Sequence, residues 1–219
     1  MGSVLENLHK IRSGIKGHNA RIVAVTKYYD ESKTIEAYNA GIKEYAENKV
    51  KDALEKKASL PRHIIEDSIW HFIGHIQTNK AKKVVGNFDY IHSLDSLKIA
   101  QCLNEEAEKR EIVQKVLIQV NNAGEATKGG FSVSELKGIF GQLINLKSLK
   151  IVGLMNIAPY TEDKTELGLL FEEIRELRDY LQSEYNCELP ELSMGMSNDY
   201  SVALEHGATM IRLGSILFR

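Results

Sequence analysis

The sequence has few of the residues that crosslink a chain or interrupt its secondary structure. Only two of its 219 residues are cysteines, and only three are prolines. Cys102 and Cys187 lie far apart and outside any C-x-x-C spacing. This pattern favours two reduced thiols over a disulfide framework, and we expect a cytoplasmic protein.

The sequence also lacks an excess of charge of one sign and any long apolar run. Its formal net charge is −2 and its pI is near 6.4, which gives no indication of a nucleic acid or an anionic membrane as partner. No apolar stretch approaches membrane-spanning length, and the N-terminus has no apolar signal-peptide core. We therefore expect a soluble protein that binds neither nucleic acid nor membrane.

No proline-, glycine- or serine-rich linker divides the chain, so we expect one domain over residues 1–219. Short apolar runs alternate with amphipathic segments throughout. The predicted strands are residues 21–27, 44–48, 70–75, 90–95, 115–121, 150–158, 191–197 and 210–218. The predicted helices are residues 4–15, 32–39, 49–58, 79–85, 96–110, 132–145, 164–185 and 199–206.

Eight strands, each followed by a helix except the last, is the number that closes a parallel (β/α)₈ barrel of the TIM type. An open doubly wound sheet shows the same alternation and is the alternative. The number of strands, and the lack of a G-x-G-x-x-G motif after the first of them, favour the barrel.

Polar residues at the carboxyl ends of the predicted strands are the candidates for function, because parallel α/β folds place their sites there. These residues are Lys27, Asn48, His75, Asn121, Met155–Asn156, Ser197 and, within the last strand, Arg212. Lys27 closes the apolar run I-V-A-V-T-K. A lysine there either extends its ammonium to solvent or supplies an amine for Schiff-base chemistry, and the sequence favours neither.

Two serine-bearing turns predict a phosphate site. The segment S-M-G-M-S-N-D at 193–199 runs from the seventh strand into a helix, and R-L-G-S at 212–215 lies in the eighth. A capped helix alone explains the first segment. Two glycine–serine elements on neighbouring strands, after strands seven and eight of a barrel, favour a phosphate-binding cup.

Two histidines lie in the segment W-H-F-I-G-H-I-Q-T-N-K at 70–80. His71 and His75 are four residues apart on a predicted strand, a spacing that does not match the helical pairs of zinc sites, and we expect no metal. His71 is expected to be a structural, half-buried histidine. His75, at the strand end, is the better candidate for the mouth of the site.

Taken together, these segments resemble the YggS/PROSC family of pyridoxal phosphate homeostasis proteins, whose barrels are similar to the N-terminal domain of alanine racemases. The resemblance covers nearly the whole chain. It rests on A-V-T-K at 24–27, A-E-N-K-V at 46–50, the histidine segment at 70–80, I-H-S-L-D at 91–95, V-L-I-Q-V-N at 116–121, G-L-M-N-I at 153–157, L-S-M-G-M-S-N-D at 192–199 and R-L-G-S at 212–215. It implies a fold-type III barrel without the C-terminal β-domain of the racemases, and a monomer.

The resemblance also implies the cofactor and its ligands. Lys27 would hold pyridoxal 5′-phosphate (PLP) as an internal aldimine, and Ser197, Gly214 and Ser215 would bind its phosphate. Arg212 would approach the pyridine nitrogen. The other family positions around the cofactor are Asn48, His75, Met155 and Met194. The chain departs from the family at Ala46, where glycine is usual, at Ser215, where threonine is usual, and at Tyr28–Tyr29, where threonine is more typical after the lysine.

An arginine beside the pyridine nitrogen opposes ring protonation and makes the ring a weak electron sink. The resemblance therefore implies a protein of PLP and vitamin B6 homeostasis without strong turnover, with PLP-dependent apoenzymes as candidate partners and no residue assigned a catalytic role. A slow PLP-dependent amino-acid racemase is the alternative. A lysine Schiff-base aldolase with a sugar-phosphate substrate is a further hypothesis, and an inert interaction module leaves the polar strand ends unexplained.

Overall fold

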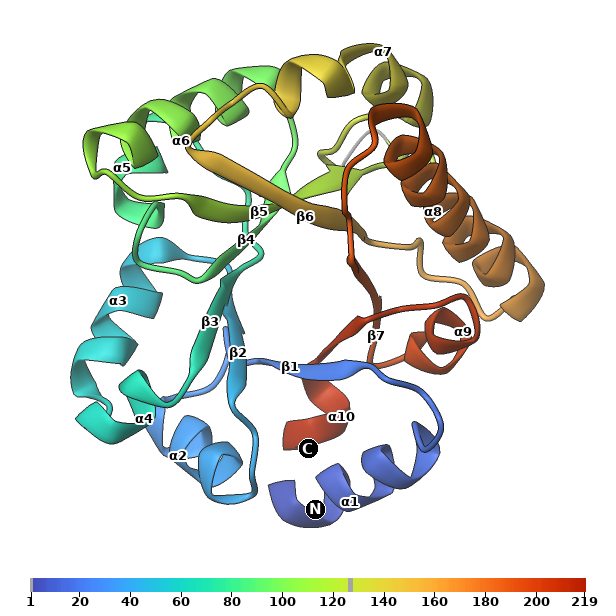
Figure 1. Cartoon of the computed structure of the whole chain (residues 1–219). Coiled ribbons are helices and arrows are strands. Elements are labelled where there is room, and N and C mark those ends of the chain that lie inside the picture. The colour runs from blue at the N-terminus through green and yellow to red at the C-terminus, as the bar shows by residue number, and fades with distance from the viewer. Residues whose placement is uncertain (1, 126–127) are drawn as a thin grey trace.

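The computed structural model describes residues 2–125 and 128–219, which form a closed barrel of eight parallel strands inside a ring of helices (Figure 1). The strands are β1 (Arg21–Val25), β2 (Glu44–Glu47), β3 (Ile69–Phe72), β4 (Tyr90–Leu94), β5 (Gln114–Val120), β6 (Leu149–Asn156), β7 (Glu191–Met196) and β8 (Met210–Leu213). Each strand pairs with the next along the chain, and β8 pairs with β1. The predicted (β/α)₈ barrel is confirmed, and the open doubly wound sheet is excluded.

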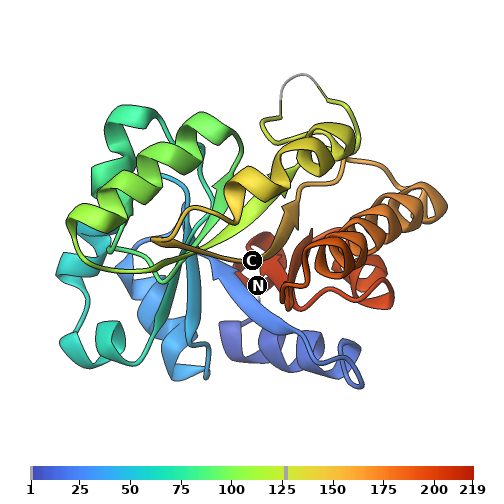
Figure 2. The same cartoon turned by 45° about the horizontal axis from the view of Figure 1, so that its top comes forward.

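The helices lie outside the strands on every side of the barrel (Figures 1 and 2). They are α1 (Val4–Gly14), α2 (Glu31–Asn39), α3 (Val50–Ser59), α4 (Arg62–Glu66), the 3₁₀ turn η1 (Thr78–Lys80), α5 (Ala81–Val84), α6 (Leu97–Lys109), α7 (Val133–Leu143), α8 (Lys164–Tyr185), α9 (Tyr200–Glu205) and α10 (Ser215–Phe218). No helix within the described residues is both long and apolar enough to cross a membrane.

Helix α8 begins and ends where the sequence predicts. Its buried positions, Leu167, Phe171, Ile174, Leu177 and Leu181, recur at helical spacing and pack in the main core. The carboxylate of Asp163 caps the first turn by accepting from the N–H groups of Thr165 and Glu166. Asn186, in the left-handed conformation, ends the helix.

The residues of each strand alternate between the helical layer and the barrel interior. The outward residues, such as Tyr45, Trp70 and Ile211, pack with the helices in the main hydrophobic core. The inward residues include Glu44, His71, His92, Ser193 and Arg212, which contact one another across the barrel. Apolar burial is therefore concentrated outside the sheet, and polar groups occupy much of the interior.

The C-terminal segment differs from the prediction. The sequence predicts one strand over residues 210–218 with no helix after it, but β8 ends at Leu213 and Ser215–Phe218 form the helical turn α10. The chain turns at Gly214. Asn7 of α1 holds the new direction, because its Nδ2 donates to the carbonyls of Leu217 (3.1 Å) and Arg219 (2.9 Å). This contact spans the whole sequence, so a local pattern does not reveal it.

Other boundaries differ less. Strand β1 ends at Val25, which places Lys27 in the turn after the strand rather than within it. The short helix α4, which follows Pro61, is not among the predicted elements. Its five residues are too few for a helical periodicity to be recognised.

The close approach of two loops at the carboxyl end of the barrel yields a prediction for stability. A Cβ atom at Gly74 would lie 1.9 Å from the carbonyl oxygen of Asn48, so Gly74→Ala forces the backbone apart. We expect the free energy of unfolding, measured with urea, to fall by at least about 3 kcal/mol. The control is Gly138→Ala on α7, where nothing lies within 4 Å, and a gain of about 1 kcal/mol is expected. Equal stability of the two variants would contradict this account.

Candidate functional site

A cavity of about 450 Å³ lies at the carboxyl ends of β1, β7 and β8. Five of the residues singled out from the sequence line it: Lys27, Ser197, Arg212, Gly214 and Ser215. Val25, Ile157 and Met196 contribute apolar wall, and Tyr28 and Tyr160, which are 82% and 84% exposed, stand at its mouth. The cavity thus combines an amine, a guanidinium and two hydroxyl-bearing turns with an apolar surface.

The backbone that carries Lys27 is held by a buried polar cluster at the residue before it. The hydroxyl of Thr26 donates to Glu47 Oε1 at 2.6 Å, and the ammonium of Lys56 donates to the carbonyl of Thr26 at 2.7 Å. Lys56 also pairs with Glu47 at 2.5 Å, and both side chains of the pair are nearly buried. These contacts hold both the hydroxyl and the carbonyl of Thr26. The backbone that leads from β1 to Lys27 is therefore fixed in position.

Two lysines line the cavity, and their surroundings differ. The ammonium of Lys128 forms an ion pair with Glu125 and donates to the carbonyl of Ala158 at 3.1 Å. Within the described residues Lys27 has no ion-pair partner, and its Nζ lies 4.9 Å from the centre of the Tyr28 ring. Lys27 is therefore the better placed of the two for a reaction of its amine.

The two serine-bearing turns are joined by the side chain of Ser197. Its Oγ accepts from the N–H groups of Gly214 (3.3 Å) and Ile216 (3.4 Å). The N–H groups of Ser197, Asn198 and Ser215 have no acceptor in the part of the chain that the structure describes. Three N–H donors and the exposed hydroxyl of Ser215 are thus available to an anion at the rim.

The first turn depends on the conformation of Gly195. Its φ is +90°, and a Cβ atom there would lie 2.7 Å from the Cβ of Ala203 and 2.9 Å from the Cα of Tyr200. Glycine is therefore required for β7 to end against α9. This packing brings Ser197 and its N–H group to the cavity.

Arg212 is a buried cation in the wall of the cavity. One terminal nitrogen, Nη1, donates to the carbonyl (2.6 Å) and hydroxyl (2.7 Å) of Ser193, and Nη2 donates to the carbonyl of Asn156 (2.7 Å). Its Nε–H has no acceptor in the described part of the chain. Burial lowers the pKa of Arg212 to about 10, against an opposing effect of Asp199. A guanidinium with two of its five N–H groups unused, the Nε–H among them, thus lines a ligand-sized space.

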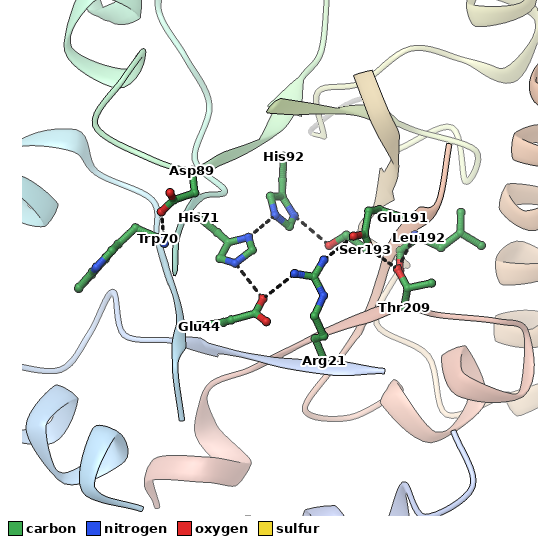
Figure 3. A network of polar contacts seen from close by, with 10 residues as sticks. All are labelled: Arg21, Glu44, Trp70, His71, Asp89, His92, Glu191, Leu192, Ser193 and Thr209. Atoms are coloured by element: carbon green, nitrogen blue, oxygen red, sulfur yellow. Dashed lines mark hydrogen bonds and ion pairs between the residues drawn. The ribbon is translucent and has the colours of Figure 1, made fainter. Parts of the chain in front are cut away.

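From Ser193, which accepts from Arg212, a chain of polar contacts crosses the barrel to Glu44 (Figure 3, from Ser193 to Glu44). His92 lies 2.9 Å from Ser193 Oγ and 2.8 Å from His71, and His71 lies 3.1 Å from Glu44. Burial is the main cause that lowers the pKa of both histidines, although the carboxylate of Glu44 opposes it at His71. His71 is thus fully buried rather than half-buried, and both imidazoles are neutral near pH 7.

The other residues singled out from the sequence do not line this cavity. His75 is exposed, hydrogen bonds through Nδ1 to Asp95 at 2.8 Å, and lines a neighbouring hollow that shares Lys128 and Ile157 with the cavity. Asn48 is half-buried and contributes its backbone to the contact with Gly74. Met155 packs inside the barrel with Leu117 and Val152, and Met194 packs in the helical layer.

These placements do not support Asn48, His75, Met155 or Met194 as residues of the cavity. Met194 is on the outward face of β7 because it alternates with Ser193, which faces inward. Asn121, another residue predicted from its place at a strand end, holds the loop that carries Lys128. Its Nδ2 donates to the carbonyl of Lys128 at 2.9 Å. No group of three or more potential metal ligands is found within the described ranges.

Sequence reasoning assigned no role to His92, Ser193 or Asp199. The first two are inward residues of β4 and β7, and period-two alternation within I-H-S-L and E-L-S-M was the signal that could have found them. Asp199 is buried and accepts from the N–H of Met196, and burial raises the pKa of its carboxyl. No local pattern distinguishes it from an ordinary helix cap.

The neutral, buried histidines predict a pH-dependent stability. Unfolded histidines take up protons near pH 6.5, whereas His71 and His92 in the folded chain do so at lower pH. Because the unfolded state then binds more protons, the free energy of unfolding falls as the pH drops below about 6.5. In His92→Gln this fall should be less steep by up to about 1.4 kcal/mol per pH unit. Urea titrations at a series of pH values measure both slopes.

The control for this experiment is His18→Gln, because the side chain of His18 is exposed. Its slope should match that of the unaltered protein. A slope in His92→Gln equal to that of the unaltered protein would mean that His92 carries a proton in the folded state.

Comparisons with known proteins agree with this geometry. The sequence profile of the alanine racemase N-terminal domain family matches residues 1–219. The pyridoxal phosphate homeostasis protein of Aquifex aeolicus is 44% identical over 220 residues, which cover 100% of this chain and 95% of that protein.

Solved structures give the same result. PipY of Synechococcus elongatus, solved with PLP bound, is 35% identical and superposes with a TM-score of 0.89 over 99% of this chain and 100% of its own. Alanine racemase of Clostridium difficile is 15% identical with a TM-score of 0.76, and the match covers 98% of this chain but 56% of the racemase. It shares the barrel fold. The chain therefore belongs to the alanine racemase N-terminal domain family and, within it, to the family of pyridoxal phosphate homeostasis proteins.

Proposed function

We propose that this protein binds PLP in the cavity at the ends of β1, β7 and β8 and acts in the homeostasis of this cofactor. The observation that carries the proposal is that an amine, two anion-binding turns and a buried guanidinium line one cavity. The names of its full-length relatives and the PLP in the PipY structure support the same cofactor.

Lys27 supplies the covalent link to the cofactor. Its amine attacks the aldehyde carbon, a C=N bond forms, and the aldehyde oxygen leaves as water. The reaction needs an uncharged amine free of other bonds, and Lys27 has no ion-pair partner in the described residues, whereas Lys128 does. The resulting Schiff base can exchange with other amines, because the mouth of the cavity is open beside Tyr28 and Tyr160.

The residues at the rim suit the phosphate. Its oxygens need hydrogen-bond donors, and the N–H groups of Ser197, Asn198 and Ser215 are available together with the Ser215 hydroxyl. Ser215 keeps the hydroxyl of the threonine usual in the family. The Oγ of Ser197 acts differently from a direct ligand: it holds the two turns together by accepting from Gly214 and Ile216.

Arg212 suits the pyridine nitrogen and limits turnover. Its free Nε–H is a donor, and a guanidinium cannot accept a proton from the ring. A cation at this place keeps the ring nitrogen unprotonated, so the ring withdraws electrons weakly. PLP supplies an electron sink in amino-acid enzymes, and here that property is weakened. Storage and release of PLP therefore fit the cavity better than amino-acid chemistry.

The racemase alternative requires a second proton-transferring group on the far side of the cofactor. Tyr28 and Tyr160 are exposed at the mouth, Lys128 is held by Glu125, and Asp199 is held by the N–H of Met196. The tyrosines are not held in one place, and Lys128 and Asp199 are already bound to other groups. None of the four is both held in position and available to transfer a proton. We therefore propose a carrier that works as a cytoplasmic monomer and passes PLP to apoenzymes, without strong racemase activity.

The proposed link to PLP is tested at Lys27. The purified protein loaded with PLP should absorb visible light, and Lys27→Ala should abolish this band because no imine can form. Lys27→Arg is the matched control: it keeps the positive charge for the phosphate but cannot form the imine, so it should also lose the band while binding PLP weakly. Borohydride reduction followed by mass spectrometry should place a phosphopyridoxyl group on Lys27.

Three results would contradict the proposal. A visible band that persists in both variants would place the Schiff base on another lysine. A reduced sugar adduct on Lys27 without PLP would support an aldolase instead. Conversion of L-alanine to D-alanine at an appreciable rate, lost with Lys27, would support a racemase.

The proposed phosphate site is tested at the joined turns. Ser197→Ala removes the acceptor for two N–H groups, so the turns separate and the phosphate loses its preformed site. We expect the Kd for PLP, measured by absorbance titration, to rise about tenfold, as the loss of one to two hydrogen bonds implies. Ser201→Ala on α9, with its exposed side chain, is the control and should leave the Kd unchanged. An unchanged Kd in Ser197→Ala would show that the phosphate lies elsewhere.

A further inference from the structure

An unbroken line of side chains crosses the barrel interior from Glu44 at the amino end to Arg212 in the wall of the cavity. Figure 3 shows the part of it from Glu44 to Ser193. Glu44 Oε2 lies 3.1 Å from His71 Nε2, His71 Nδ1 lies 2.8 Å from His92 Nε2, and His92 Nδ1 lies 2.9 Å from Ser193 Oγ. Ser193 Oγ in turn lies 2.7 Å from Nη1 of Arg212. The two histidines, Ser193 and Arg212 are all buried. No residue of this line other than Arg212 lines the cavity.

The direction of each hydrogen bond in the line follows from the groups at its two ends, a carboxylate and a guanidinium. Glu44 Oε2 also lies 3.2 Å from the guanidinium of Arg21, which can only donate, so this oxygen is an acceptor. His71 Nε2 must therefore donate to it. In a neutral imidazole the other nitrogen is then an acceptor, so His71 Nδ1 accepts from His92 Nε2–H.

The hydrogen bonds between His92 and Arg212 run in the same direction. His92 Nδ1 is an acceptor, and it accepts from the hydroxyl of Ser193. The serine oxygen accepts from Arg212 Nη1, which can only donate. Every bond in the line thus points the same way, from the guanidinium towards the carboxylate. This arrangement leaves no donor facing another donor, and it requires the Nε2–H tautomer of both histidines.

We propose that Glu44, His71, His92 and Ser193 form a one-way hydrogen-bond relay that positions Arg212 and couples it to the protonation state of the opposite end of the barrel. These are positioning residues, because they reach the cavity only through Arg212. The Glu44 end is open to protons: Glu44 and Arg21 line a surface hollow of about 260 Å³ at the amino end. The relay thus links two surfaces of the barrel through its interior.

One added proton reorders the relay. His71 next to Glu44 is the favoured place for it, because a carboxylate stabilises the cation. His71 Nδ1 then donates to His92, which must change to its Nδ1–H tautomer and donate to Ser193 Oγ. The Ser193 hydrogen has to rotate away. Its oxygen then accepts from both His92 and Arg212, so the field at the guanidinium changes.

Several charged groups face the histidines and set where this change occurs. Arg21 on β1 and Arg212 on β8 oppose a second positive charge, whereas Glu44 on β2 and Asp89 before β4 favour it. Tyr90 on β4 stacks on the His71 ring at 4.9 Å, with Lys115 of β5 over the tyrosine, and Glu191 on β7 pairs with Arg21 at 2.5 Å. Burial disfavours the charged form, so the change is expected below pH 6.5.

The relay can be tested on the protein without PLP. Nitrogen-15 NMR of the imidazoles at pH 7.5 should find both His71 and His92 in the Nε2–H tautomer. The side-chain Nε–H signal of Arg212 should shift with pH together with the histidine signals. Either histidine in the Nδ1–H form, or an Arg212 signal that ignores the histidine titration, would overturn the proposal.

Two matched variants separate the relay from a general effect of charge. Glu44 and Glu191 both pair with Arg21, but only Glu44 contacts His71. Glu44→Gln should move the midpoint of the Arg212 signal to lower pH by about one unit or more, because the histidine cation loses its carboxylate. Glu191→Gln also removes one negative charge beside Arg21, but outside the relay. It should move the midpoint of the Arg212 signal by less than half as much. Equal shifts in the two variants would overturn the relay.

The Ser193 step has its own pair of variants. Ser193→Ala should uncouple the Arg212 signal from the histidine titration, and Ser193→Thr, which keeps the hydroxyl, should restore the coupling. Circular dichroism checks that each variant is folded, and Glu44→Gln carries the test where Ser193→Ala does not fold. If the Arg212 signal of Ser193→Ala still follows the histidine titration, the proposal fails.

The effect on the cofactor rests on the proposed function. In protein loaded with PLP, the visible band should change with pH at the midpoint of the relay, and this change should move in Glu44→Gln. A protein that fails to bind PLP but shows the coupled NMR titration would refute the proposed function and leave the relay standing. A bound cofactor whose band does not follow the relay would refute the link to PLP.

Discussion

The pairing of β1 with β8 is the contact on which the cavity depends. The register runs from Arg21 opposite Met210 to Ala24 opposite Leu213, so the two strands end at the same level. Beyond that level the chain turns at Lys27 on one side and at Gly214 and Ser215 on the other. In an open sheet these residues would lie on opposite edges. Closure of the barrel brings an amine from the start of the chain beside hydroxyls and N–H groups from its end.

Closure also creates an interior that must be filled, and this chain fills much of it with polar groups. In most barrels of this type the interior holds layers of branched apolar side chains. Here a buried guanidinium is satisfied by two carbonyls and a hydroxyl, and that hydroxyl leads through two imidazoles to a carboxylate. Such a network is tolerable because every member has a partner. The apolar layer between strands and helices supplies the burial that stabilises the fold.

The sequence predicted the architecture well because the alternation of strands and helices repeats eight times, and one misplaced boundary does not change the count. It predicted the bounds of α8 because apolar residues recur at helical spacing along its whole length, and in the structure Asp163 and Asn186 cap its two ends. It failed at residues 214–218, where a contact with Asn7 determines the structure. For the cavity, the strand-end rule located Lys27, Ser197 and Arg212, and the pattern of two serine-bearing turns located Gly214 and Ser215. Met194 came from the family resemblance alone, and its alternation with the inward Ser193 places it in the helical layer instead.

The cavity and the interior network place their functional groups in different parts of the chain. The groups that would meet a cofactor directly, Lys27, Ser197 and Ser215, lie in turns just beyond the strands, beside an open mouth. Exchange of a ligand requires such access. The group that would set the electronic character of the ligand, Arg212, lies within β8 and is fixed by the interior network. Access and electronic control would therefore depend on different elements, because a ligand can leave through the open mouth while the interior network holds Arg212 in place.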